Sequence, residues 1–113
     1  MKGTNLGEFQ ELVLLTIGIL YPEAYGVGIK EEILAKTGRK VTLSTVHAAL
    51  NRLEKKGLVE SHFGETTQIR GGKRKRYFKM TAYGLKTLEE ARAQREELWK
   101  AIPQQVLQMK TSY

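Results

Sequence analysis

The stretch LSTVHAALNRLEKKGLVESHF, residues 43–63, changes its hydrophobic period near its middle. Its first part can be capped by Ser44 and ended by Gly57, and it carries one apolar stripe at helical spacing. The stripe consists of Val46, Ala49, Leu50 and Leu53. From Leu58 onward the period changes, and Val59, Ser61 and Phe63 alternate with Glu60 and His62, which is typical of a half-buried strand. The stretch therefore predicts a helix that is followed directly by a strand.

The face opposite the apolar stripe is slender, polar and basic. Short side chains let a helix axis approach base edges in a major groove about 12 Å wide, and longer ones such as Asn51 and Arg52 reach further. We therefore expect major-groove contacts from Ser44, Thr45, His47, Ala48, Asn51 and Arg52. For the helix alone, the alternative is an ordinary exposed face of a helical bundle.

A second strand is predicted in GGKRKRYFKM, residues 71–80, where alternation places Phe78 and Met80 on one face and Tyr77 and Lys79 on the other. With residues 58–63 it forms a basic hairpin. The same alternation puts Arg74 and Arg76 on the face of Phe78, so the cations do not all point one way. We expect backbone contacts, or contacts with an adjacent minor groove, from Lys55, Arg70, Gly71, Gly72, Lys73, Arg74, Lys75 and Arg76. A solvated charge run and a nuclear-localisation signal are alternatives, but neither accounts for the paired glycines.

The chain before residue 43 predicts two more helices. Asn5 and Glu8 have the spacing of a capping box ahead of a first helix that extends to residue 20. Its apolar stripe comprises Leu6, Phe9, Leu12, Val13, Leu15, Thr16, Ile17 and Leu20. Leu14 and Ile19 lie off this stripe, which indicates a second buried side against another subunit.

A second helix is expected over about residues 24–37, with Gly38 as its stop. Its inward residues are Val27, Ile29, Ile33 and Leu34. Residues 39–42 are short enough to pair once as a strand.

A last helix is predicted after residue 81, where Thr81 can cap it and Pro103 should end or kink it. It carries a thin apolar stripe made of Leu85, Leu88, Ala91, Leu98, Ile102 and Val106. The fold class is therefore mainly α with a small hairpin, and the order of three helices and a hairpin is that of a winged helix-turn-helix.

The chain of 113 residues has a formal net charge of +7, and residues 58–81 carry more than half of the excess, with six basic and two acidic side chains. Such a focused charge favours a polyanionic partner. No apolar run is long enough for a membrane span, the first residues do not resemble a secretory signal, and there is no cysteine, so a cytoplasmic protein is expected. No catalytic constellation, metal site or cofactor motif is evident, which argues against an enzyme.

Four successive segments resemble the PadR family of bacterial transcriptional regulators: LGEFQELVLLTIGIL, AYGVGIKEEI, LSTVHAALNRLEKKGLVES and RGGKRKRYFKMTAYG. The resemblance covers about residues 6–88. It implies a winged-helix domain over residues 1–81 and a C-terminal dimerisation helix and tail over residues 82–113. It also implies a homodimeric repressor that binds a pseudo-palindromic operator in double-stranded DNA.

Two features of the resemblance concern particular residues. The family usually has tyrosine where this chain has His47, although an imidazole can still donate to phosphate. The chain is similar to short members with one C-terminal helix, in some of which an aromatic residue lines a cavity for flat hydrophobic compounds. Here Trp99 would serve either this role or that of an interface anchor. The residues expected at the effector pocket or dimer interface are Trp99, Leu98, Ile102, Phe9 and Leu12. A winged-helix adaptor that binds a protein partner is the alternative function.

Overall fold

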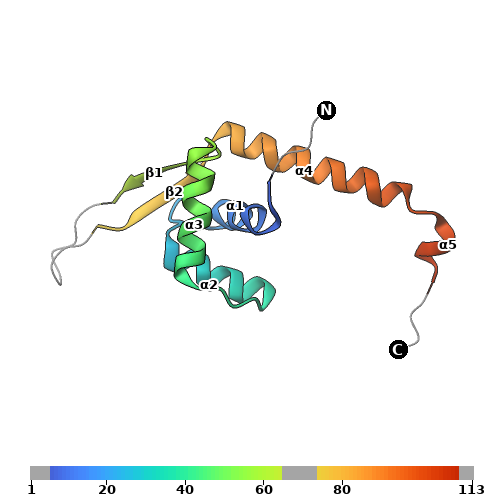
Figure 1. Ribbon diagram of the computed structural model, residues 1–113, viewed down its shortest axis with the longest axis horizontal. Helices are drawn as coiled ribbons and strands as arrows, with labels where there is room; N and C mark the ends of the chain where they lie inside the picture. The colour runs from blue at the N-terminus through green and yellow to red at the C-terminus, as the bar shows by residue number, and fades with distance from the viewer. Residues whose placement is uncertain (1–5, 65–73, 110–113) are drawn as a thin grey trace.

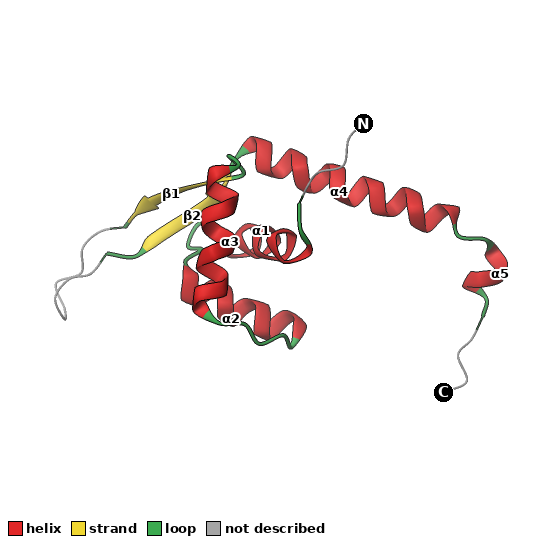
Figure 2. Ribbon diagram, viewed as in Figure 1, coloured by secondary structure: helices red, strands yellow, loops and turns green. Residues whose placement is uncertain are grey.

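The structure is a computed structural model that describes residues 6–64 and 74–109 (Figures 1 and 2). Its elements in chain order are α1 (Glu8–Leu20), α2 (Gly26–Thr37), α3 (Leu43–Lys55), β1 (Val59–Phe63), β2 (Arg76–Met80), α4 (Ala82–Ala101) and α5 (Gln104–Leu107). Three helices form the body, β1 and β2 form an antiparallel hairpin, and α4 extends from the body on the side away from the hairpin (Figure 1). This is the predicted winged-helix order.

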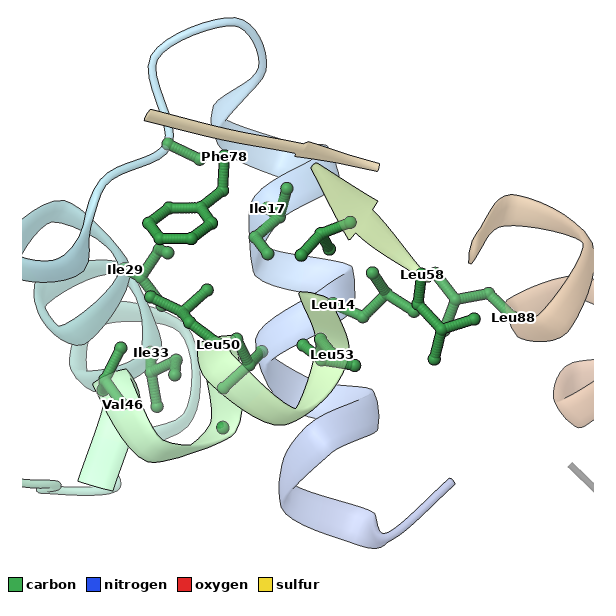
Figure 3. Packing of buried hydrophobic residues seen from close by; sticks show 14 residues of the cluster. Leu14, Ile17, Ile29, Ile33, Val46, Leu50, Leu53, Leu58, Phe78 and Leu88 are labelled. Carbon is green, nitrogen blue, oxygen red and sulfur yellow. The ribbon is translucent and has the colours of Figure 1, made fainter. Parts of the chain in front are cut away.

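The hydrophobic core lies between α1, α2 and α3 and is closed by the inner end of the hairpin (Figure 3). The predicted stripe of α3 is confirmed, because all four of its residues are buried. Phe78 of β2 is the largest fully buried side chain and lies near Ile17 and Ile29 (Figure 3). Because the hairpin, here called the wing, contributes this ring, it shares one hydrophobic core with the three helices.

Helix α1 differs from the sequence prediction in its start and in its buried face. Gly7 is the N-cap and provides no side-chain hydrogen bond, so the predicted capping box is wrong; Asn5 itself lies outside the described residues. Leu14, expected against another subunit, is fully buried in the core of this chain, whereas Leu15 of the predicted stripe is exposed. Neighbours on several sides, α2, α3, α4 and β2, cover this helix. In a helix that is apolar nearly all round, the period alone therefore does not identify the inner face.

Helix α2 begins at Gly26, two residues later than predicted. The chain before it is extended instead, because the Phe78 N–H donates to the Ala24 carbonyl at 2.8 Å and forms an isolated bridge. Ile29 and Ile33 are buried as predicted, but Val27 and Leu34 are 41% and 44% exposed, so their inward placement is wrong. The stop at Gly38 is confirmed: its φ is +73° and its N–H donates to the Leu34 carbonyl.

Residues 39–42 form no strand, contrary to the prediction. The segment ends at Thr42, whose Oγ1 accepts a hydrogen bond from the Thr45 N–H at 3.1 Å and so caps α3. The predicted cap, Ser44, lies inside the first turn. Both are hydroxyl residues, and only the backbone conformation of Thr42, which is extended, decides between them.

The hairpin pairs Val59 with Met80, Ser61 with Phe78, and Phe63 with Arg76. Its predicted inner face is confirmed for Val59 and Phe78, which are buried. Phe63, predicted on the same face, is 59% exposed because it lies at the outer end of β1, farther from the core than Val59. Arg70, Gly71, Gly72 and Lys73, which the sequence places at the wing tip, lie outside the described residues.

Helix α4 begins as predicted at a Thr81 cap. The Thr81 hydroxyl accepts from the Gly84 N–H at 3.0 Å and donates to the Gly57 carbonyl at 2.7 Å, which ties the helix to the end of α3. Leu88 and Ala91 are buried, but Leu98 and Trp99 are 66% and 65% exposed in this single chain. Of the predicted stripe, only Leu88 and Ala91 are therefore buried within one subunit, and Leu85 is 51% exposed.

The helix ends at Ala101, as Pro103 predicted, and the short α5 follows. No helix among residues 6–64 and 74–109 combines the length and apolar character needed to cross a membrane.

Candidate nucleic-acid interface

The outer face of α3 presents all of the predicted major-groove residues to solvent. Ser44, Thr45, His47, Ala48, Asn51 and Arg52 are all exposed, and so is Lys55, which was expected at the DNA backbone. They lie on a helix whose other face is anchored by the buried stripe and whose start is fixed by Thr42. Glu54 is the only acidic residue of the helix. The exposed face therefore offers hydroxyl, amide, imidazole and cationic groups, which are the groups that contact bases and phosphates.

His47 lies against the first turn of α2. A Cβ atom at Gly26 would be 2.9 Å from His47 Cε1, so the imidazole lies in the space that the missing side chain of Gly26 leaves. The contact places an exposed imidazole where the outer face of α3 meets the amino-terminal end of α2. This contact between His47 and Gly26 was not indicated by the sequence.

Aromatic side chains gather around Lys75 on one face of the hairpin, next to the outer end of β2. The Lys75 ammonium lies 4.3 Å from the centroid of the Tyr25 ring, and Tyr25 packs edge-on against Tyr77 at 6.1 Å. His62 lies 5.8 Å from Tyr77 on the neighbouring strand. The sequence prediction did not include Tyr25 or His62 in the site. The alternation of tyrosine and lysine around β2 indicates that Tyr77 shares a face with Lys75, but nothing in the sequence near Tyr25 indicates that it lies in the site.

Arg74 and Arg76 lie on the opposite face of the hairpin from Lys75, as the alternation predicted. The Arg74 guanidinium is 6.0 Å from the Phe63 ring centroid and that of Arg76 is 5.0 Å from the Phe78 ring centroid. Arg76 also forms an ion pair with Glu54 of α3. Its charge is therefore already partnered within the protein, whereas the expectation from sequence was a phosphate contact.

The residues expected at an effector pocket or dimer interface are only partly brought together. Leu98, Trp99 and Ile102 line one surface pocket with Arg95. Phe9 lies elsewhere, under the Arg39 guanidinium at 5.2 Å and in a pocket shared with residues of α3. Leu12 packs against the core. Within one subunit, Phe9 and Leu12 of α1 therefore do not share a pocket with Leu98 and Trp99 of α4.

Three helices, a basic hairpin and a polar exposed face on the third helix define a winged helix-turn-helix protein. The family model described as Transcriptional regulator PadR-like family matches residues 13–90, and the chain belongs to this family. It is accordingly a transcriptional regulator and not an enzyme.

Similar proteins agree with this membership. A transcriptional regulator from Clostridium thermocellum is 28% identical with a TM-score of 0.64, over 80% of this chain and 82% of that one. A PadR family transcriptional regulator from Eggerthella lenta DSM 2243 is 28% identical with a TM-score of 0.66, over 91% and 88%. Uncharacterized protein X of Lysinibacillus sphaericus is 36% identical over 74 residues, which are 64% of this chain and 65% of that protein.

Proposed function

We propose that this regulator is a homodimeric repressor that binds a pseudo-palindromic operator. Helix α3 enters the major groove, and the wing contacts the backbone or an adjacent minor groove. The observation that carries the proposal is the outer face of α3, where exposed hydroxyl, amide and cationic side chains stand without an exposed carboxylate. The absence of negative charge favours contact with a polyanion, whereas an ordinary solvated helix face has no such bias.

The division of roles follows from side-chain length and position. Ser44, Thr45 and Asn51 lie along the exposed face of α3 and are proposed to contact base edges, together with His47, Ala48 and Arg52. Lys55, Arg74 and Lys75 stand at the end of α3 and on the wing, and they are proposed to contact phosphates. Phosphate contacts position a protein on DNA, while base contacts give sequence preference.

Dimerisation is proposed to use residues 82–113. No residue of α4 after Ala91 is buried, and several apolar side chains within residues 82–109 are half or more exposed in this single chain. They include Leu85, Leu98 and Trp99 of α4, with Val106, Leu107 and Met109 in and after α5. A second subunit would cover them, and Trp99 would then either anchor the interface or stack on a flat hydrophobic effector. The protein is proposed to act in the cytoplasm.

Selection of bound duplexes from a random pool with the purified protein tests the proposal. A symmetric site with half-sites spaced by about 10 base pairs, or a multiple of that, is expected, because two α3 helices must then reach the same face of the duplex. Sedimentation equilibrium is expected to give a dimer. If affinity for duplex DNA is independent of salt, phosphate binding is excluded, and a role as a protein-binding adaptor would replace the proposal.

Binding of an effector is tested separately by titrating flat aromatic compounds against the fluorescence of Trp99. We expect the compounds to quench this fluorescence and to release the protein from its DNA complex. A Trp99→Ala protein that is released from DNA by the same compounds would contradict a role for this ring.

A further inference from the structure

Three side chains join the recognition helix α3 to the wing. We infer that Glu54, Ser61 and Arg76 form a strut that fixes the wing relative to α3. Arg76 then promotes DNA binding as a positioning residue and not as a phosphate contact. The inference rests on the proposed DNA-binding function and concerns how its two contacting parts are held together.

The three side chains close a triangle of polar contacts. Arg76 Nη2 is paired with Glu54 Oε1, and Arg76 Nε donates to Ser61 Oγ at 3.1 Å. Ser61 Oγ in turn donates to Glu54 Oε2 at 2.7 Å. Both carboxylate oxygens are therefore engaged, and each residue contacts the other two. Arg76 and Glu54 are 40% and 34% exposed, so the charges are partly shielded from solvent. The planar guanidinium suits such a contact with two partners.

The triangle lies outward from the points at which the backbone holds the wing. The Phe78 N–H donates to the Ala24 carbonyl and the Thr81 N–H to the Leu58 carbonyl, so both bonds hold the inner end of β2. Arg76 is two residues further out, opposite Phe63 in the hairpin register. Because the contact to Glu54 spans from β2 to α3, it restrains the part of the wing beyond these backbone bonds.

The position of Glu54 makes a direct phosphate contact by Arg76 unfavourable. Glu54 is the only acidic residue of α3, and Arg76 neutralises it beside the proposed DNA surface. If Arg76 turned to a phosphate, a half-buried carboxylate would be left without its cation next to a polyanion. Arg74 and Lys75 are exposed wing cations that can reach phosphates without breaking this ion pair.

The sign of the effect of Glu54→Gln distinguishes the two roles. The probe is a fluorescein-labelled 30-base-pair duplex of mixed sequence, titrated at several salt concentrations. Simple electrostatics predicts tighter binding, because a negative charge is removed and Arg76 is released. The strut predicts weaker binding, by about two- to fivefold for a partly exposed ion pair. Glu60→Gln is the matched control, since it breaks the Glu60–Lys79 pair within the hairpin and changes the charge equally. It should not weaken binding.

Charge reversal tests the pairing itself. Arg76→Glu and Glu54→Lys should each weaken binding, and the double variant, which has the charge of the parent, should recover most of the loss. A direct phosphate contact predicts no recovery. If a single reversal does not fold, Ser61→Ala replaces it, because removing the hydroxyl leaves both charges in place and should still weaken binding.

Hydrogen exchange in the DNA-free protein gives a second measurement that does not depend on the proposed function. Glu54→Gln should accelerate exchange of the amides of residues 61–63 and 76–77, while those of α1 stay as in the parent. Salt-independent binding of the parent to the duplex would defeat the proposed function but not the strut. Unchanged or tighter binding by Glu54→Gln, or unchanged exchange at these amides, overturns the strut.

Discussion

The imidazole of His47 occupies the space in front of Gly26, where an added Cβ atom would meet His47 Cε1 at 2.9 Å and Leu43 Cδ1 at 3.3 Å. Helix α3 and the start of α2 therefore pack together where the His47 ring lies against Gly26. Because the ring is exposed and sits at the end of a rotatable side chain, it can move aside when position 26 changes.

This contact predicts that the effect of Gly26→Ala depends on residue 47. In the parent the substitution must displace the imidazole, so its gain in helix propensity is cancelled. In a His47→Ala background the same substitution should stabilise the protein, by up to about 1 kcal/mol. Urea unfolding of the four proteins of this double-mutant cycle measures the difference. Equal effects in both backgrounds would contradict the contact.

Gly84 and Gly18 should respond in opposite ways to alanine. A Cβ atom at Gly84 would lie 2.1 Å from the Leu58 carbonyl oxygen, so α4 would have to move away from the body. We expect Gly84→Ala to cost about 3 kcal/mol or more. At Gly18 the nearest atom is the flexible end of Met80 at 3.0 Å, and alanine there should be neutral or stabilising. Thermal or urea unfolding compares the two; similar stability would contradict the tight approach of α4.

Two phenylalanines of the hairpin should differ strongly in their contribution to stability. Phe78 is 1% exposed, and truncation to alanine should cost about 3–5 kcal/mol because it leaves a cavity in the core. Phe63 is 59% exposed, and its truncation should change the free energy of unfolding by no more than about 0.5 kcal/mol. Urea unfolding measures both. A large loss of stability on Phe63→Ala would show that it is covered in solution.

Wing and helix substitutions should separate affinity from sequence preference. Lys75→Gln should weaken binding to all duplexes about equally and lower the log–log salt slope by about 0.9 for each phosphate that is no longer neutralised. Asn51→Ala should alter preference at one position of each half-site, by about 1–3 kcal/mol. Competition binding with a set of single-base variants of the selected site measures both. If Lys75→Gln weakened binding to the operator but not to other duplexes, the proposed division of roles would be wrong.

The sequence by itself predicted the elements whose residues separate cleanly into two faces. The prediction of helix α3 was correct because its four core residues form one stripe among polar neighbours. The predicted end of α2 at Gly38 was correct because the left-handed backbone conformation there favours glycine. The exposed face of α3 follows from the same separation, so the candidate interface on this helix was predicted from sequence. The Thr81 cap and the end of α4 before Pro103 are equally local properties.

Only the tertiary structure decided matters that depend on neighbours distant in the sequence. Helix α1 is covered on several sides, so packing and not periodicity selected Leu14 over Leu15. The Phe78 N–H donates to the Ala24 carbonyl, and this hydrogen bond keeps Ala24 in an extended segment before α2. In the same way, Arg76 appears in the sequence as one cation of a basic run. Its partner is a carboxylate 22 residues earlier, because an ion pair depends on the distance between atoms and not on position along the chain.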